Sequence, residues 1–179
     1  MSKKVLILSA SLRNNSNSEA LAESFKQGAE AAGHAVEIIS LKGKQIAFCK
    51  GCFVCQKTGS CVIKDDAIAI YEAMQKAEVL VFAGPIYYYG LSGQLKTMLD
   101  RANPLFPQEY AFRDVYLLAT AADAAEQAVH GSKVGVQGWV DCFEKASFKG
   151  TVFAGGVNLA GEIAGHKALQ EAYRLGERV

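Results

Sequence analysis

The segment 9–18 concentrates groups that bind anions. It reads SASLRNNSNS, combines hydroxyls and amides with one guanidinium, and begins where the apolar run 5–9 ends. Free N–H groups and the dipole at a helix start favour a negatively charged ligand, and these side chains add further donors. A simple helix cap would explain only one or two of them. We therefore predict a phosphate-binding loop with contacts from Ser9, Ser11, Arg13, Ser16 and Ser18.

A second candidate loop follows another apolar run, 79–83. It reads GPIYYYG over residues 84–90 and places a proline between glycine and three tyrosines. A flat ring system needs main-chain groups for its polar edge and an aromatic or glycine surface for its face. Each tyrosine taken alone is more typical of a core or an interface, but the turn as a whole is typical of a binding loop. We predict that the ring contacts are made by Tyr87, Tyr88, Tyr89 and Gly90.

The two loops together favour one ligand. The first loop has neither the glycine pattern of a dinucleotide fold nor the Gly-Lys-Ser/Thr of an NTPase. A flavin monophosphate fits better, because it combines a terminal phosphate with a flat ring system.

Four of the five cysteines lie close together in the sequence. Cys49, Cys52, Cys55 and Cys61 have the spacing C-x2-C-x2-C-x5-C, which is compact enough for four thiolates to meet at one metal centre. The opening resembles a ferredoxin loop, so a [4Fe-4S] cluster is one interpretation, whereas zinc more often uses two separated C-x2-C pairs. Reduced thiols packed near the flavin are the other interpretation. Cys142 is expected to be buried on an apolar helix face.

The elements that must position these loops alternate between strands and helices. Short apolar runs predict strands at 5–9, 36–40, 79–83, 115–119 and 151–154, and helical spacing predicts helices at 18–32, 67–76, 92–101, 133–146 and 166–174. The pattern predicts an α/β fold with a doubly wound, five-stranded parallel sheet of order 2-1-3-4-5, in a single domain over residues 1–179. Ligands of such sheets bind where strands one and three diverge, and both loops leave those strands.

Charged residues outside the loops are expected to cap helices or to form ion pairs at the surface. Asp65 and Asp66 precede a predicted helix and are expected to cap it, while Lys96, Asp100 and Arg101 are expected to form surface pairs.

Lys and Arg total 19 against 18 for Asp and Glu, so no net field attracts nucleic acid or an anionic membrane. Neither a membrane-spanning stretch nor a signal-peptide core is recognisable, so we expect a cytoplasmic protein with no nucleic-acid or membrane partner.

These motifs carry a resemblance to a known family. The segments SASLRNNSNSEAL, CKGCFVCQKTGSCVIKDD and GPIYYYGLSGQLKTMLDR resemble the NADPH-dependent FMN reductase family of flavodoxin-like proteins over most of the chain. The resemblance implies that the FMN phosphate is surrounded by Ser9, Ser11, Arg13, Ser16, Asn17 and Ser18. It implies that the isoalloxazine ring is lined by Pro85, Ile86, Tyr87, Tyr88, Tyr89 and Gly90. It also implies a third flavin loop at residues 120–123, with contacts from Thr120 and Ala121, where this sequence has alanines in place of the usual glycines. The cysteine spacing is similar to that of the iron-sulfur flavoproteins, a branch of the same group.

The function that this resemblance implies is an FMN-dependent NAD(P)H oxidoreductase. Its electron acceptor would be small, such as a quinone, a nitro or azo compound, or free flavin. The cofactor carries the chemistry of such enzymes, so no side chain is assigned as a catalytic acid or base. One alternative is an iron-sulfur flavoprotein that transfers electrons through a [4Fe-4S] cluster. Another is a non-enzymatic flavodoxin-type carrier or docking protein, although such carriers are usually strongly acidic and this chain is not. A homodimer or homotetramer is also implied.

Overall fold

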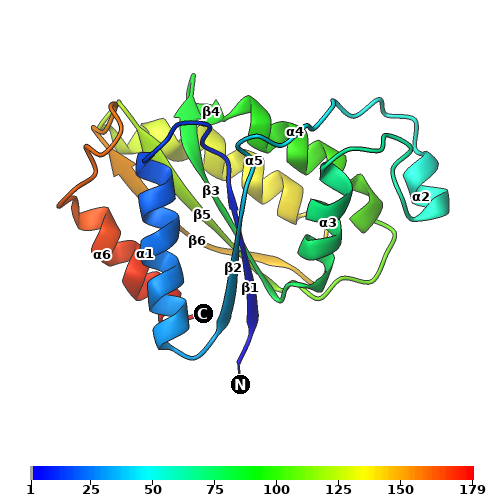
Figure 1. Cartoon of the computed structure of the whole chain (residues 1–179), viewed down its shortest axis with the longest axis horizontal. Coiled ribbons are helices and arrows are strands. Elements are labelled where there is room, and N and C mark those ends of the chain that lie inside the picture. Colours follow the sequence, from blue (N-terminus) through cyan, green and yellow to red (C-terminus); the bar gives the residue numbers. More distant parts are fainter. Residues whose placement is uncertain (1) are drawn as a thin grey trace.

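A parallel sheet with helices on both faces forms the body of the protein, which a computed structural model describes over residues 2–179 (Figure 1). The parallel strands are β1 (Lys4–Ser9), β2 (Ala35–Ser40), β3 (Val79–Tyr87), β5 (Asp114–Ala121) and β6 (Ser147–Gly155). The helices are α1 (Asn17–Ala31), α2 (Val54–Thr58), α3 (Ala67–Lys76), α4 (Gly93–Arg101), α5 (His130–Val140) and α6 (Lys167–Gly176), and two 3-10 turns lie at Asn103–Leu105 and Glu126–Val129.

The strand order confirms the predicted flavodoxin-like topology. The parallel strands follow the order β2-β1-β3-β5-β6, which is 2-1-3-4-5 when only these five are counted. The sheet has one strand more than predicted, β4 (Gly90–Leu91), which pairs antiparallel with the end of β3. It arises because β3 continues to Tyr87, well beyond the apolar run that marks its start in the sequence.

Alternating side chains of the strands fill two separate cores. On one face Val5 and Ile7 pack with Leu21 and Phe25 of α1 and with α6. On the other face Leu6 and its neighbours pack under α3, α4 and α5. Figure 1 shows these two helix groups on opposite sides of the sheet. Strands buried on both faces read as continuous apolar runs, which is why the sequence predicts them well. In residues 2–179, no helix has the length and apolar character needed to span a membrane.

The end of α5 differs from the prediction. The helix covers His130–Val140 instead of 133–146, and Cys142 lies in the turn that follows it. Cys142 is exposed, so its predicted burial is wrong. Phe143 enters the core because it continues the face of Val136 and Val140 that packs on the sheet, whereas Cys142 lies to one side of that face.

The contact between α1 and α6 depends on glycine. A Cβ atom added at Gly28 would lie 2.0 Å from the carbonyl oxygen of Tyr173, and one added at Gly176 would lie 2.1 Å from that of Phe25. We expect Gly28→Ala to lower the free energy of unfolding by about 2 kcal/mol, because the two helices would have to separate. Urea denaturation measures this change.

A matched control for Gly28 is available in α5. Gly138 is an exposed helical glycine with no atom within 4 Å of an added Cβ. Gly138→Ala is expected to raise the free energy of unfolding by about 1 kcal/mol through helix propensity alone. If Gly28→Ala were as stable as the unmodified protein, the close approach of α1 and α6 would be contradicted.

Candidate functional site

The carboxyl ends of β1, β3, β5 and β6 surround a hollow of about 240 Å³. This edge of the sheet lies at the top of Figure 1, on the side of β4. Parallel strands bring their following loops to one edge, so segments far apart in the sequence meet here. The hollow is lined by Ser11, Arg13, Ser16, Asn17, Ser18, Pro85, Ile86, Tyr87, Tyr88, Thr120, Ala121, Ala122, Val157 and Asn158.

Three of the residues predicted from the sequence do not line this hollow. Ser9 is buried within β1, and Gly90 pairs with Tyr87 in the β3–β4 hairpin. The hydroxyl of Tyr89 donates a hydrogen bond to Asp123 Oδ2 at 3.1 Å, which links the hairpin to the loop after β5. This bond to the carboxylate raises the pKa of Tyr89 above its ordinary value.

Two lining residues, Val157 and Asn158, were not predicted. They follow β6, the fifth parallel strand, whose carboxyl end lies beside that of β5. The signal that points to them is topological: every loop at the carboxyl ends of neighbouring parallel strands is a candidate, whatever its composition.

The first turn of α1 forms the anion-binding end of the hollow. Ser16 is the N-cap, and its hydroxyl accepts a hydrogen bond from the backbone N–H of Glu19 at 3.2 Å. The N–H groups of the next residues have no partner inside a helix. Ser18 is 1% exposed, and its hydroxyl has no hydrogen-bond partner among residues 2–179. A buried hydroxyl without a partner costs about 1–3 kcal/mol, so this end of the hollow fits a phosphate oxygen.

The β3–β4 hairpin forms the aromatic side of the hollow. Tyr88 and Tyr89 occupy its turn with φ values of 48° and 62°, a left-handed conformation that is uncommon for aromatic residues. The turn is supported from α5, where a Cβ added at Gly131 would lie 2.2 Å from the carbonyl oxygen of Tyr89. Unfavourable backbone conformations persist where the surroundings enforce them, and they cluster at functional sites. Tyr88 is fully exposed at the mouth of the hollow, where its ring is free to contact a ligand.

The loop after β6 is attached to the phosphate end by side chains. Arg13 Nη1 donates to the carbonyl oxygen of Asn158 at 2.6 Å, and Asn17 Nδ2 donates to that of Leu159 at 2.9 Å. Glu162 Oε2 accepts from the N–H groups of Asn158 and Leu159 at 2.6 and 2.9 Å. These two backbone hydrogen bonds lower the pKa of Glu162. The side-chain amide of Asn17 is therefore engaged with protein, and its backbone N–H is one of the first-turn groups without a partner inside the helix.

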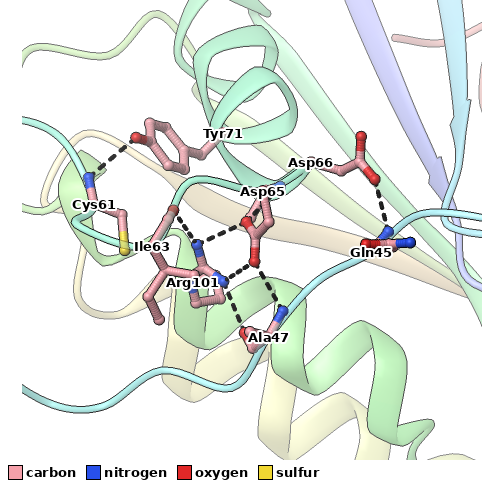
Figure 2. Close-up of polar contacts among 9 residues, drawn as sticks. Gln45, Ala47, Cys61, Ile63, Asp65, Asp66, Tyr71 and Arg101 are labelled. Atoms are coloured by element: carbon pink, nitrogen blue, oxygen red, sulfur yellow. Dashed lines mark hydrogen bonds and ion pairs between the residues drawn. The ribbon is translucent and has the colours of Figure 1, made fainter.

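The loop that carries the four clustered cysteines, residues 49–61, is anchored by a buried arginine (Figure 2). Arg101 Nη1 and Nη2 donate to the two carboxylate oxygens of Asp65 at 2.6 and 2.8 Å. The same nitrogens donate to the carbonyl oxygens of Ala47 and Ile63, which lie on either side of the four cysteines. Arg101 thus ties both ends of the loop to the end of α4.

These contacts correct two predictions. Arg101 has a fully buried side chain and does not form a surface pair, although Lys96 and Asp100 do pair at the surface. Asp66 accepts from the N–H of Gln45 and does not cap α3 through its side chain. Burial raises the pKa of Asp65, but hydrogen bonds from Arg101 and from backbone N–H groups lower it by more, so the net pKa is below its ordinary value.

The four clustered thiols do not converge. Cys49 and Cys52 are exposed, whereas Cys55 is buried and its sulfur accepts from Asn103 Nδ2 at 3.2 Å. In the part of the chain that the structure describes, no three His, Cys, Asp or Glu side chains are placed to hold a metal ion. Cys49 lies instead with Cys142 at a separate hollow near the ends of α4 and α5. This arrangement does not fit a [4Fe-4S] cluster.

A sequence model of the NADPH-dependent FMN reductase family matches residues 3–167. The chain belongs to this family. The chain is 30% identical to the Bacillus subtilis protein YwqN over 98% of this chain and 97% of that protein. The name of that relative describes a putative NAD(P)H-dependent FMN-containing oxidoreductase.

Other relatives match a shorter part of this chain. The iron-sulfur flavoprotein MJ1083 of Methanocaldococcus jannaschii is 35% identical over 57% of this chain and 53% of its own length. The match therefore spans about half the length of that relative. Among solved structures, an NAD(P)H:quinone oxidoreductase from Methanothermobacter marburgensis has a TM-score of 0.78 at 20% identity, covering 99% of this chain and 96% of the other. This likeness shows a shared flavodoxin-like fold.

Proposed function

We propose that the hollow binds FMN and that the protein uses it to pass electrons from NAD(P)H to a small acceptor. The observation that carries this proposal is the meeting, in one hollow, of an unpartnered buried hydroxyl at a helix start and an exposed tyrosine hairpin. The first suits a phosphate and the second a flat ring, in agreement with the family. When bound, FMN supplies the acceptance and donation of hydride or electrons. Family membership favours an enzyme over a non-enzymatic carrier.

The proposal gives each part of the hollow a role. The phosphate is held by Ser11, Ser16 and Ser18 with the N–H groups that open α1, and Arg13 adds the positive charge. Residues 85–88 and the segment Thr120, Ala121 and Ala122 line the ring. Tyr89 and Asp123 join these two walls through their hydrogen bond, and Gly90 closes the hairpin. Ser9 acts only through its position at the end of β1.

Two measurements test the proposal. Titration of the apoprotein with FMN should quench flavin fluorescence and saturate at about one flavin per chain. NADH and NADPH oxidation should then be faster with the loaded protein than with free FMN, when a quinone, a nitro compound, an azo compound or free flavin is the acceptor. Absence of FMN binding, or absence of turnover with every acceptor and both nucleotides, would contradict the proposal.

We also propose that the working form is a homodimer or homotetramer. Exposed apolar side chains from three loops surround the hollow, namely Leu12, Tyr88 and Leu159. A second copy that covers these side chains would shield the flavin from water while leaving room for a small acceptor. Size-exclusion chromatography with light scattering measures the molar mass of the protein in solution. A monomer at micromolar concentration would contradict this proposal.

The dispersed thiols lead to a prediction about metal content. We expect protein purified without oxygen to show the absorbance of flavin only, with less than about 0.5 iron and sulfide per chain, because at least three ligands must converge to hold a cluster. Iron and acid-labile sulfide assays make the measurement. Four irons and four sulfides per chain, lost together in Cys55→Ser, would show that the loop rearranges around a cluster, as in an iron-sulfur flavoprotein.

A further inference from the structure

The segment 157–163, which we name the strap, crosses the first turn of α1 beside the hollow. Residues Val157 and Asn158 at its start line the hollow, and Ile163 at its end is buried in the core of that face. We propose that Glu162 and Asn17 are positioning residues that hold the strap as the wall on the phosphate side of the FMN site. This inference rests on the proposed function and adds to it the residues that shape its phosphate end.

Asn17 fixes the strap to α1 at two points. Its Nδ2 donates to the carbonyl oxygen of Leu159 at 2.9 Å, and its Oδ1 accepts from the N–H of Ile163 at 3.2 Å. Both bonds join residues more than 140 positions apart in the sequence, and Asn17 is 8% exposed. Buried amides bonded at both ends fix the geometry of what they join. The strap therefore has a defined height above the helix start that would receive the phosphate.

Glu162 fixes the near end of the strap. One oxygen of its carboxylate accepts from two consecutive N–H groups, those of Asn158 and Leu159. Hydrogen bonds to a charged acceptor are roughly twice as strong as neutral ones. They turn the carbonyl oxygen of Asn158 toward Arg13, which donates to it at 2.6 Å.

The arrangement leaves Arg13 available to an anion. Its guanidinium is held by a neutral carbonyl group, and within residues 2–179 it forms no ion pair. Glu162 could compete for this cation, but its carboxylate is engaged by the two strap N–H groups. The strap thus places Arg13 at the lining of the hollow with its charge uncompensated, which is what recognition of a phosphate requires.

This role predicts a difference between two ligands. FMN carries the phosphate and riboflavin lacks it, while both carry the same ring. Release of the strap should weaken FMN binding and leave riboflavin binding nearly unchanged. A general loss of fold would weaken both, so the ratio of the two dissociation constants separates positioning from structural damage.

The experiment compares Glu162→Ala, Glu162→Gln and Asn17→Ala with Glu171→Ala as a matched control. Glu171 is an exposed glutamate of α6 that pairs with Lys167, away from the strap. Fluorescence titration should show that Glu162→Ala and Asn17→Ala raise the Kd for FMN on the order of tenfold, which corresponds to the loss of one or two charged or buried hydrogen bonds. Glu162→Gln keeps a neutral acceptor and should recover part of the loss. Riboflavin should change by less than about twofold in every variant.

A second measurement does not depend on the variants. Hydrogen exchange of the unmodified protein should slow at the N–H groups of residues 158 and 159 when FMN binds, and not when riboflavin binds. An unchanged FMN Kd in Glu162→Ala, or equal shifts for FMN and riboflavin, would overturn the positioning role. If the unmodified protein does not bind FMN at all, the proposed function fails first and the inference falls with it.

Discussion

Asp65→Asn is expected to lower the free energy of unfolding by about 3–5 kcal/mol, the usual cost of leaving one partner of a buried ion pair alone. Arg101 has no exposed side-chain surface, so its charge depends on the Asp65 carboxylate that it contacts through two nitrogens. Asparagine keeps the shape of Asp65 but removes the charge. Denaturation by urea, followed by circular dichroism, measures the loss.

Asp100→Asn is the matched control, because Asp100 pairs with Lys96 on the exposed face of α4 at 2.6 Å. Exposed pairs contribute little, so this variant should change stability by less than about 1 kcal/mol. The double variant Arg101→Met with Asp65→Leu should recover only part of the loss, since apolar residues can replace a buried charge pair but cannot replace its hydrogen bonds to the backbone of Ala47 and Ile63. A change below 1 kcal/mol in Asp65→Asn would contradict the importance of the pair.

The same pair predicts a dependence on pH. The net pKa of Asp65 in the folded protein is below its ordinary value of 3.8. A lowered carboxyl pKa stabilises the fold above the ordinary value, and this stabilisation is lost as pH falls through the folded value. The unmodified protein should therefore lose stability more steeply than Asp65→Asn below about pH 4, as measured by urea midpoints. Parallel curves for the two proteins would contradict the assignment.

Ser16→Asp is expected to weaken FMN binding on the order of a hundredfold without unfolding the protein. Aspartate caps a helix as well as serine does, so the bond to the N–H of Glu19 has a replacement acceptor. The added carboxylate lies in the lining of the hollow at the proposed phosphate end. Two like charges about 5 Å apart repel by roughly 3 kcal/mol at an effective dielectric constant near 20.

Ser16→Asn separates charge from shape, because asparagine is an equally good cap without a charge. It should weaken FMN binding by less than about tenfold, and riboflavin should bind both variants similarly. Fluorescence titration gives the affinities, and thermal melting checks that both variants fold. If aspartate and asparagine had the same effect on FMN, the phosphate would lie elsewhere.

The predicted site and the observed hollow overlap because both depend on the strands. Residues 11–18 and 85–88 reach one hollow since β1 and β3 are adjacent, as the flavodoxin-like strand order requires. The strap escaped prediction because residues 157–163 have no distinctive composition. Its position comes from Asn17 and Glu162, and the bond from Asn17 to Leu159 spans 142 positions. That these residues bind FMN stays a prediction for the titrations above.

By itself, the sequence determined the alternation of strands and helices, and its resemblance to flavodoxin-like proteins implied the order of the sheet and the edge at which the loops after β1 and β3 meet. The alternation follows from local hydrophobic periodicity, which each short segment carries within itself, and right-handed crossovers then place helices on both faces of the sheet. Only the tertiary structure decided that Arg101 is buried against Asp65, that the four thiols separate, and that the strap crosses α1. Each of these depends on contacts between residues distant in the sequence, where packing outweighs the polar or apolar character of a single side chain.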